Sequence, residues 1–412
     1  MPISKPRLES QLRDMAEIGQ NQRGGITRLA YSPADLRARR LLTAWIEALG
    51  LQARVDQVGN IFARRRGTEE GPVIMIGSHL DTVTNGGAFD GTLGVIAALE
   101  VLTALAEDGI QTKLPVELVV FACEESSRFG CSLVGSKFLT GGLLPEKLSS
   151  YHDNEGVTIL DVLKQCGFAS EVPVRTELPA EGIKAFLELH IEQFDSLAKI
   201  DTPIGIVDII AAPTRLKITV EGMSSHSGAT PMFARRDALV AAAELVLAIE
   251  KLGWLEAKAQ TVATVGEMEI SPGNINVVPG RVNLFVDIRG VDHTSKQRLV
   301  TALSNVVYSL TNKRKGITFN IETLSDEVPV ALSPALVSLA QETCTRIGLP
   351  FHVMHSAAGH DCMAMAKVAP AGLIFIRNVS GISHSPEEWV DPADVYTGTH
   401  LLYQMVQQLA GI

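Results

Sequence analysis

Histidine and carboxylate side chains stand at the ends of four apolar segments of this sequence. Singly, such residues are usually hydrogen-bonded structural groups or parts of a solvated turn. Together, imidazoles and carboxylates form the ligand set with which proteins hold Zn, Mn, Co or Ni. The sequence therefore predicts a metal cluster if the fold brings these ends together. The candidate ligands and their near neighbours are His79, Asp81, Asp90, Glu124, Glu125, His190 and His384.

Asp90 is the candidate for a ligand that two ions share. It lies in the glycine-rich segment 86–91, where the glycines let the backbone turn tightly around a site. One carboxylate can bridge two ions held about 3.5–4 Å apart, as in two-metal hydrolases. Asp81, close behind His79, could accept the other ring N–H of that imidazole, or could instead cap a turn. Thiolate ligation is not expected, because no pair of cysteines has the spacing of a metal site.

Short apolar runs must position these side chains. Residues 73–77, 116–122, 185–190 and 373–376 are apolar runs of strand length, and a candidate ligand ends or follows each of them. Helical segments alternate with the strands, which predicts a parallel sheet covered by helices. The carboxyl ends of such strands meet at one edge, where α/β proteins bind their ligands. The predicted fold class is α/β, with a mixed, mostly parallel sheet between helices.

The middle of the chain follows another pattern. Between residues 213 and 328, strand-like segments with two helical ones predict a separate α+β sandwich. Breaks near Pro213 and Pro329 mark the two crossings. We therefore expect a discontinuous catalytic domain, residues 1–212 and 329–412, with an inserted domain, residues 213–328.

Composition and charge limit the possible partners. The 412 residues are 46% hydrophobic and 20% charged, which is ordinary globular composition, and the length suggests two domains. A net charge of -10 without a clustered basic face argues against nucleic-acid binding. Five scattered cysteines favour a reducing compartment. Neither an apolar signal core nor a run of about 18 apolar residues is present, so we expect a cytoplasmic protein without a membrane partner.

Several motifs resemble those of a known family. Segments 77–81, 87–91 and 124–125 look like the dinuclear metallopeptidase clan that includes aminoacylases and carboxypeptidase G. The chain is more similar still to N-carbamoyl-L-amino-acid hydrolases, allantoate amidohydrolases and yeast-type β-ureidopropionases, from about residue 10 to residue 408. The motifs that resemble this subgroup are Ser127–Gly130, Leu189–Gln193, Gly273–Gly280 and Gly359–Asp361.

The resemblance implies two divalent ions in each subunit, Mn, Co, Ni or Zn, in a zinc-peptidase-like fold. Glu124 would be the general base. Peptidase relatives usually carry a carboxylate where this sequence has His190, which favours the carbamoyl-hydrolase branch. The family's smaller domain is a lid that also forms a homodimer, in agreement with the insertion expected above. The implied ligands are His79, Asp90 and His190 for one ion, and Asp90, Glu125 and His384 for the other.

A second group of residues is predicted to bind a small carboxylate-bearing substrate. His226, in a small polar loop, is a candidate donor to the oxyanion of the tetrahedral intermediate, or else part of a surface turn. In relatives, the equivalent histidine reaches the neighbouring subunit's site. The resemblance assigns the substrate carboxylate to Arg289, with Asn276 and Gln193 as polar partners. A surface ion pair for Arg289 and a hairpin contact for Asn276 are the alternatives. Gly359 is also predicted to bind the substrate.

These features predict metal-dependent hydrolysis of the ureido amide of N-carbamoyl-L-amino acids to the amino acid, ammonia and CO2. Allantoate amidohydrolase is the main alternative, because allantoate also carries a ureido amide and a carboxylate. A dipeptidase or an aminoacylase is disfavoured by His190 and by the segment around Asn274. A catalytically inactive binding protein on the same fold would have a broken ligand set, and the set here is complete.

Overall fold

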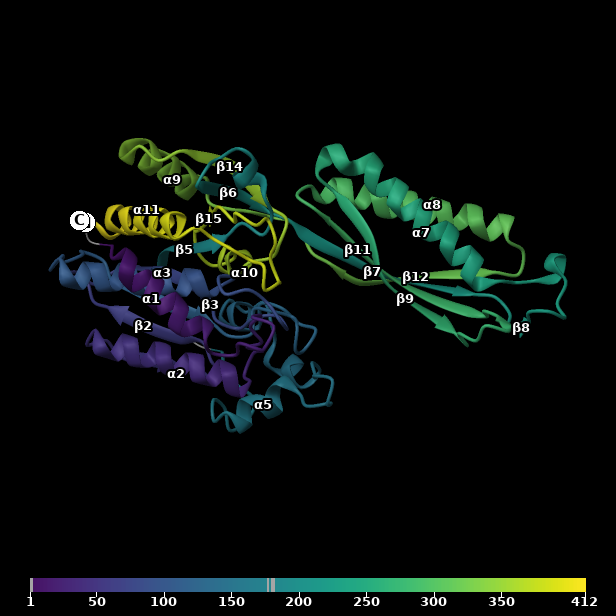
Figure 1. Ribbon diagram of the computed structural model, residues 1–412, viewed down its shortest axis with the longest axis horizontal. Helices are drawn as coiled ribbons and strands as arrows, with labels where there is room; N and C mark the ends of the chain where they lie inside the picture. Colours follow the sequence, from purple (N-terminus) through teal and green to yellow (C-terminus); the bar gives the residue numbers. More distant parts are fainter. Residues whose placement is uncertain (1–2, 176–177, 179–181) are drawn as a thin grey trace. The chain divides into compact units, whose positions relative to one another are not determined.

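In the computed structural model, which describes residues 3–175, 178 and 182–412, the chain divides into two compact units (Figure 1). The first comprises the chain up to Asp208 together with Leu332–Met354 and His360–Ile412. The second comprises Ile209–Ala331 and His355–Gly359. The chain thus crosses between the units four times, and the predicted domain bounds did not include the segment His355–Gly359 in the second unit. None of the described helices has the length and apolar character needed to cross a lipid bilayer.

A mixed sheet forms the centre of the first unit. Its four middle strands, in the order β4-β3-β5-β15, are parallel, and antiparallel strands extend it on both sides. Every residue of β3, β4 and β15 is buried, as expected when helices cover both faces of a parallel sheet. Among the described residues, the strands of this sheet are β1 Ala53–Val55, β2 Ile61–Arg65, β3 Val73–His79, β4 Val116–Phe121, β5 Ile183–Ile191, β6 Ile204–Ile210, β13 Val330–Ala331, β14 Phe351–Ser356 and β15 Ala371–Ile376.

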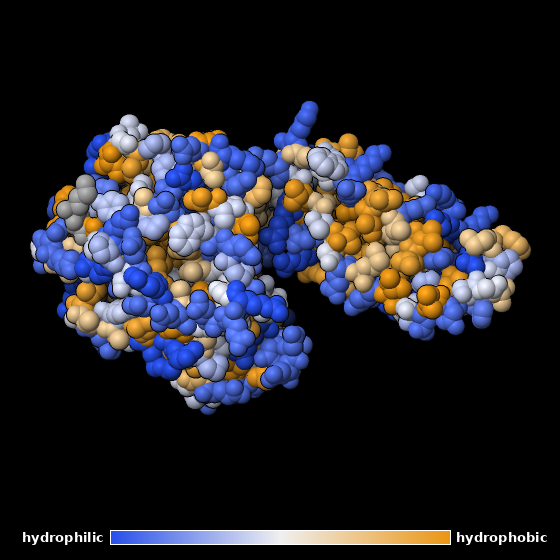
Figure 2. Space-filling view, in the orientation of Figure 1, coloured by the Kyte–Doolittle hydropathy of each residue, from blue (hydrophilic) through white to orange (hydrophobic). Residues whose placement is uncertain are grey.

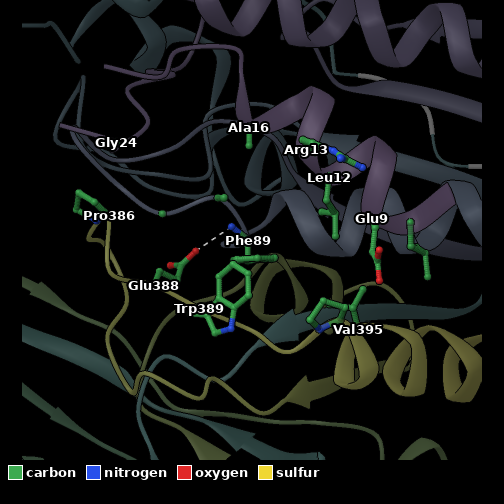
Figure 3. A pocket seen from close by; sticks show the side chains of 14 residues that line it. Glu9, Leu12, Arg13, Ala16, Gly24, Phe89, Pro386, Glu388, Trp389 and Val395 are labelled. Carbon is green, nitrogen blue, oxygen red and sulfur yellow. Dashed lines mark hydrogen bonds between the residues drawn. The ribbon is translucent and has the colours of Figure 1, made fainter. Parts of the chain in front are cut away.

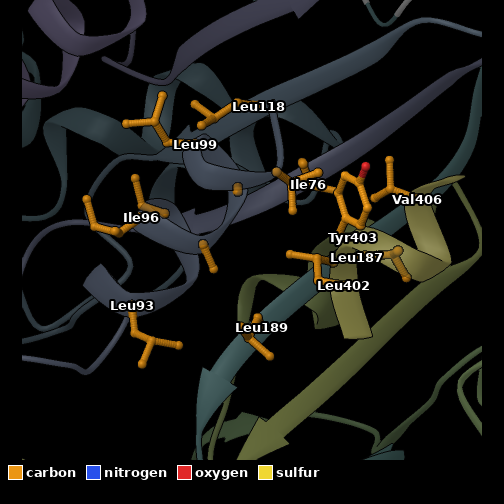
Figure 4. Close-up of a cluster of buried hydrophobic side chains, with 14 of the residues drawn as sticks. Ile76, Leu93, Ile96, Leu99, Leu118, Leu187, Leu189, Leu402, Tyr403 and Val406 are labelled. Carbon is orange, nitrogen blue, oxygen red and sulfur yellow. The ribbon is translucent and has the colours of Figure 1, made fainter. Parts of the chain in front are cut away.

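Helices pack on this sheet, and the largest apolar cluster of the described residues lies between the sheet and α3, α1 and α11. Nearly every residue of α3 is buried, because its apolar side chains surround the helix and it lies between β3 and the helices α1 and α11. Leucines and isoleucines of α3, β3, β4, β5 and α11 meet in one cluster (Figure 4). The helices of this unit are α1 Lys5–Ala16, α2 Pro33–Ala48, α3 Thr92–Glu107, α4 Val134–Leu139, α5 Ile159–Gln165, α6 Ser196–Lys199, α9 Pro334–Ile347, α10 Asp361–Met365 and α11 Pro392–Ala410, with a 3-10 turn at Pro145–Ser149.

Local capping sets where the longer helices start and stop. The hydroxyl of Ser32 accepts the N–H of Asp35 at the start of α2, as its Ser-Pro sequence predicts. Asp391 and Pro392 form the same kind of start for α11, and Gly411 ends that helix in the left-handed conformation. These caps agree with the helices expected from the sequence.

The second unit has a four-stranded antiparallel sheet, in the order β12-β7-β11-β9. Along β11, buried and partly exposed residues alternate, and the buried set packs against helices on that face. The short strand β10 pairs with β8, whereas β11 joins the larger sheet, so the two strands on either side of Pro279-Gly280 belong to different sheets. The elements are β7 Ala212–Glu221, β8 Ser225–His226, α7 Ala238–Glu256, β9 Val262–Ser271, β10 Val277–Val278, β11 Arg281–Gly290, α8 His293–Lys313 and β12 Thr318–Asp326, with 3-10 turns at Met232–Ala234 and Ala257–Ala259.

Candidate metal centre

Four neighbouring strands of the first unit bring candidate ligands to one edge of the sheet. His79 is the last residue of β3, and His190 is next to the last residue of β5. Glu124 and Glu125 follow β4, and His384 lies in the loop after β15. Because these strands are parallel neighbours, their carboxyl ends converge. Residues far apart in the sequence therefore meet in one cluster.

We call His79, Asp90 and His190 the inner triad. Asp90 Oδ1 lies 3.6 Å from His79 Nε2 and 3.2 Å from His190 Nε2. The three residues are buried, with relative exposures of 2%, 6% and 1%. One ligand atom from each lies within 4.8 Å of the others. This spacing lets three atoms face a single ion.

Asp90 also belongs to an outer triad, with Glu125 and His384. His384 Nε2 lies 3.4 Å from Asp90 Oδ2 and 3.2 Å from Glu125 Oε1. The side chain of His384 is 48% exposed. The two oxygens of Asp90 thus face different triads, which is the arrangement that a bridging carboxylate needs.

Backbone carbonyl groups determine which nitrogen of each inner imidazole is protonated. His79 Nδ1 lies 2.9 Å from the carbonyl oxygen of Asp81, and His190 Nδ1 lies 3.0 Å from that of Ile191. A carbonyl oxygen only accepts, so in the neutral rings Nδ1 carries the proton and the lone pair of Nε2 faces Asp90. Lone pairs and a carboxylate oxygen repel one another unless a proton or a metal ion lies between them. The donor set therefore fits a divalent transition-metal ion.

Opposite charges at this edge shift the pKa values of the ligands. Burial lowers the pKa of His79, but carboxylates, Glu124 foremost, outweigh it and raise that pKa well above its usual value. Burial raises the pKa of Asp90, yet the surrounding imidazoles hold it well below the usual range. Hydrogen bonds to the outer-triad carboxylates raise the pKa of His384 to about 10. Each partner thus favours the charged form of the other.

The side chain of Asp81 has a different contact from the one predicted. Its Oδ1 is 3.9 Å from His79 Nδ1, too far for a hydrogen bond, so the backbone carbonyl of Asp81 orients that ring instead. The Asp81 carboxylate accepts the backbone N–H groups of Glu124 and Glu125, at 3.2 and 3.0 Å. A fully buried carboxylate needs such donors, and burial raises the pKa of Asp81 to about 6. Asp81 therefore holds the turn that carries both glutamates.

Glu124 stands beside the inner triad and belongs to neither triad. Its Oε2 lies 3.7 Å from His79 Nε2, and the residue is 8% exposed. Burial raises the pKa of Glu124 well above its usual value, although His79 opposes the shift. A carboxylate whose pKa is raised takes a proton more readily than a solvated one, and its protonated form can later return that proton. The position and environment of Glu124 suit a general base.

Glu388 anchors the loop that carries Asp90, and sequence reasoning missed it. Its Oε1 accepts the backbone N–H groups of Phe89 and Asp90, at 2.8 and 3.0 Å. The Ser383 hydroxyl lies 3.0 Å from Asp90 Oδ2 and 3.1 Å from Glu388 Oε2, and Gln193 Nε2 lies 3.3 Å from the same Asp90 oxygen. Burial raises the pKa of Glu388 to about 7. The one signal for Glu388 in the sequence is its place in the loop that supplies an outer-triad ligand.

Gly91 leaves the space that the His79 ring occupies. Its φ is +63°, and a Cβ atom built there would lie 2.3 Å from that ring. The N–H of Gly91 also points at His190 Nε2, at 3.2 Å. Because α3 begins at the next residue, this glycine joins the ligand loop to a buried helix without a clash.

A third grouping of possible ligands lies deeper, at Glu188, His190 and His360. Both oxygens of Glu188 already accept hydrogen bonds, from the Ser78 hydroxyl at 2.8 Å and the Cys362 N–H at 3.0 Å. These bonds account for Glu188 as a structural carboxylate that ties three chain segments together.

The other predicted substrate-binding residues belong to the second unit. Nδ1 of His226 accepts the N–H groups of Gly228 and Ala229, both at 3.1 Å. In the neutral ring Nε2 therefore carries the proton and can donate it to a ligand. Asn276 is exposed, and its backbone carbonyl accepts the N–H of Ser227 at 3.0 Å. Within the part of the chain that the structure describes, His226 Nε2 and the Asn276 amide form no hydrogen bond that would prevent them from facing a ligand.

The guanidinium group of Arg289 forms an ion pair within the second unit. Its Nε and Nη2 donate to the carboxylate of Asp287, at 2.8 and 3.3 Å. Arg215 also donates to Asp287, at 3.3 Å, so this carboxylate has a second cationic partner. A substrate carboxylate at Arg289 would have to compete with Asp287. Gly359 is exposed and lies in the segment after β14.

Comparison with known proteins gives consistent matches over the whole chain. The model of peptidase family M20/M25/M40 matches residues 75–408. An N-carbamoyl-L-amino acid amidohydrolase of Geobacillus stearothermophilus is 37% identical over 99% of both chains. The allantoate amidohydrolase of Escherichia coli is 36% identical over 98% of this chain and 97% of its own. A ureidoglycolate hydrolase of rice is 34% identical over 99% of this chain and 85% of its own.

A solved structure agrees with the observed fold. The amidase of the hydantoinase/carbamoylase family from Burkholderia multivorans superposes with a TM-score of 0.87, at 36% identity, covering 99% of this chain and 98% of that one. The mixed sheet and the strand-end cluster described above therefore occur in a chain whose full-length relatives carry three different amidohydrolase or ureide-hydrolase names.

Proposed function

The chain belongs to peptidase family M20/M25/M40, and from that premise we propose that it hydrolyses the carbamoyl amide of N-carbamoyl-L-amino acids. It is a hydrolase of carbon–nitrogen bonds, like its amidohydrolase relatives. The observation that carries the proposal is the pair of triads that share Asp90, with the free carboxylate of Glu124 beside them. A complete set of candidate metal ligands beside a carboxylate that can act as acid and base argues against an inactive binding protein.

Two divalent ions fit the two triads. The inner triad would hold one and the outer triad the other, with Asp90 between them. When bound, such ions polarise a carbonyl group and lower the pKa of water toward neutrality. Imidazole and carboxylate ligands are compatible with Mn, Co, Ni or Zn. The assay described below therefore tests which of these metals supports activity.

Glu124 would take a proton from the attacking water and return it to the departing nitrogen. Its burial raises its pKa, which makes it a stronger base toward the attacking water than a solvated carboxylate. One water molecule converts the substrate to the free amino acid, ammonia and CO2. The Asp81 carboxylate holds the N–H groups of Glu124 and Glu125, and thereby the position of the base.

The second unit would supply the substrate contacts. A bidentate guanidinium such as that of Arg289 suits a carboxylate, and the second partner of Asp287, Arg215, allows the Asp287 carboxylate to remain paired when Arg289 turns to a substrate. The N–H at Nε2 of His226 would stabilise the oxyanion. Gln193, from the first unit, and Asn276 would add polar contacts.

A homodimer would use the exposed apolar surface of the second unit. Strand β9 is an edge of its sheet and contacts α7, and both expose large apolar side chains, some of them visible in Figure 2. Exposed edges and apolar faces of this kind usually pack against another chain. The exposed residues are Val240, Leu247, Trp254, Leu255, Val262, Met268 and Ile270.

Trans-complementation tests both the dimer and the role of His226. Glu124→Gln and His226→Ala would each be inactive as homodimers. If His226 serves the partner's centre, a mixed dimer has one site with both residues intact and regains a fraction of the activity. Mixed dimers without any activity would show that His226 acts within its own subunit or not at all.

The substrate assay measures ammonia release from N-carbamoyl-L-amino acids, allantoate and ureidoglycolate, each with Mn, Co, Ni and Zn in turn. We expect at least one metal to support turnover, fastest with an N-carbamoyl-L-amino acid. Faster turnover of allantoate or ureidoglycolate would move the assignment to the relatives with those names. Failure with all three substrates and all four metals would refute the proposed function.

A further inference from the structure

A pocket of about 450 Å³ lies in the first unit, lined in part by residues of the loop that carries Asp90 (Figure 3). Helix α1 forms one wall, residues 87–89 form another, and the segment from Pro386 to Val395 closes the third. This volume is within the range of small-molecule sites, about 300–1,000 Å³. None of the residues of the two triads lines the pocket, so it is separate from the metal centre.

The pocket has an apolar, aromatic interior. Leu8, Leu12 and Val395 are buried on its walls. Phe89 and Trp389 meet edge to face, with ring centres 5.8 Å apart. Trp389 remains 55% exposed, although it lines a concave site. Aromatic side chains arranged in this way offer a large contact area to a flat or branched apolar group.

The charged residues around the pocket indicate which polar group a ligand would carry. Arg13 lines it, is exposed, and forms no ion pair with any residue in the described part of the chain. Glu9 and Glu388 also line it, and Glu9 pairs with Lys5 on its other side. Of the residues described, Arg13 is the one cation that lines the pocket, so it can pair with one carboxylate group, whereas Glu9 and Glu388 would repel a doubly charged phosphate more strongly than a singly charged carboxylate.

We propose that this pocket binds a small monocarboxylic acid with an aromatic or branched apolar body, its carboxylate on Arg13 and its body between Leu12, Phe89 and Trp389. A free α-amino acid and a simple carboxylic acid share this chemistry. Glu9 is the group that could recognise an ammonium, so comparison of the two kinds of ligand distinguishes them.

Occupancy of the pocket is coupled to the metal centre through Glu388. Its carboxylate lines the pocket and also accepts the N–H groups of Phe89 and Asp90 (Figure 3). A ligand that presses on Phe89 or Glu388 therefore acts on the backbone of the shared ligand Asp90. This coupling, unlike binding in the pocket, rests on the proposed metal centre.

Tryptophan fluorescence can report the pocket directly. The chain has three tryptophans, Trp45, Trp254 and Trp389, and only Trp389 lines the pocket. In the variant Trp45→Phe/Trp254→Phe, titration of 3-phenylpropionate into the metal-free protein should give a saturable change in emission. L-Phenylalanine tests the added ammonium, and 2-phenylethanol tests the loss of the carboxylate. No saturable change with either acid up to millimolar concentration would overturn the proposal.

Matched variants locate the bound acid. Arg13→Gln should weaken the binding of 3-phenylpropionate about tenfold or more, because its carboxylate loses a hydrogen bond to a charged group. Arg40→Gln is the control, since Arg40 is also an exposed arginine on a helix and does not line the pocket. Ala16→Phe, which fills the wall at the end of α1, should abolish binding. Binding that survives Ala16→Phe, or falls equally in Arg13→Gln and Arg40→Gln, would show that the acid lies elsewhere.

The coupling is measured as metal affinity. Saturating 3-phenylpropionate should change the apparent dissociation constant of the metal several-fold, and the metal should change the dissociation constant of the acid by the same factor, because linkage is reciprocal. If the acid binds in the pocket but the dissociation constant of the metal does not change, the coupling is disproved, and the binding site itself is still supported. Loss of metal binding with intact pocket binding would count against the proposed function alone.

Discussion

The two triads share one carboxylate and yet differ in how they are held. In the inner triad all residues are buried, and backbone carbonyls fix both imidazoles through Nδ1. In the outer triad the His384 side chain is 48% exposed, and among the described residues its contacts are those of Nε2 with Asp90 and Glu125. His384 also adopts a φ of 59°, in the left-handed region. One side of the centre is prearranged and the other is open.

This difference separates two tasks within one centre. A buried, oriented set of ligands holds an ion with little loss of conformational entropy on binding. An exposed ligand in a loop permits exchange and leaves room for a substrate. We therefore expect the inner triad to provide the more stable metal site and the outer triad to respond more strongly to solution conditions.

The largest expected effect comes from Glu124, the proposed base beside the inner triad. Glu124→Gln keeps the shape of the side chain and removes its ability to take a proton, so kcat should fall about 10²–10⁴-fold. Both ions should remain bound, because Glu124 belongs to neither triad. Turnover numbers and metal content by mass spectrometry check both statements. A variant with nearly normal kcat would disprove the role of Glu124.

Gly91→Ala should damage the inner triad selectively. The new Cβ would meet the His79 ring at 2.3 Å, and that buried ring has little freedom to move away. We expect the affinity of the inner ion to fall more than about 100-fold, beyond the usual effect of a change around the ligands. Gly109→Ala is the matched control, because Gly109 has the same φ of +63° and open space at its Cβ. Equal losses in both variants would mean that backbone strain, and not the clash, is responsible.

Glu388→Gln tests whether the shared ligand needs its anchor. The amide retains one acceptor oxygen but loses the charge that faces the N–H groups of Phe89 and Asp90. Residues that orient metal ligands typically contribute about 10–100-fold to metal affinity, and both ions should weaken because both use Asp90. Glu387→Gln, at an exposed neighbouring position, should leave both affinities unchanged. Weakening of only one ion would argue against a shared ligand.

The smallest effect concerns the order of metal removal. A chelator should take the outer ion first, because ordering one mobile side chain costs about 0.5–1.5 kcal/mol, which corresponds to between about twofold and tenfold in affinity. His384→Ala should lower the affinity for the outer ion and leave the affinity for the inner ion unchanged. Chelator titrations followed by metal analysis give both constants. Removal of the inner ion first would reverse the comparison between the triads.

Much of the first unit could be anticipated from local patterns. Runs such as 73–77 and 116–122 are apolar because both faces of a central parallel strand are buried, and this burial is visible in composition alone. Caps such as Ser32-Pro33 depend on adjacent residues and are equally visible. The types of the candidate ligands and their positions at strand ends could likewise be predicted from local sequence.

Other features depend on contacts between distant segments. The Asp81 carboxylate serves the two glutamates after β4, and Glu388 reaches the Asp90 loop across 298 positions of sequence. The sequence pattern around Glu388 is that of a polar surface turn, so its burial was not foreseeable. The ion pair of Arg289 with Asp287 arises because residues two apart on β11 point to the same face.

The sequence by itself identified the candidate metal ligands and the strands that carry them, and its family resemblance singled out Glu124 as the candidate base. Only the tertiary structure decided that one triad is closed and the other open, and which groups hold Asp90 in place. The physical reason is that burial of a strand follows from its own side chains, whereas burial and hydrogen bonding of a ligand depend on what the rest of the chain packs around it.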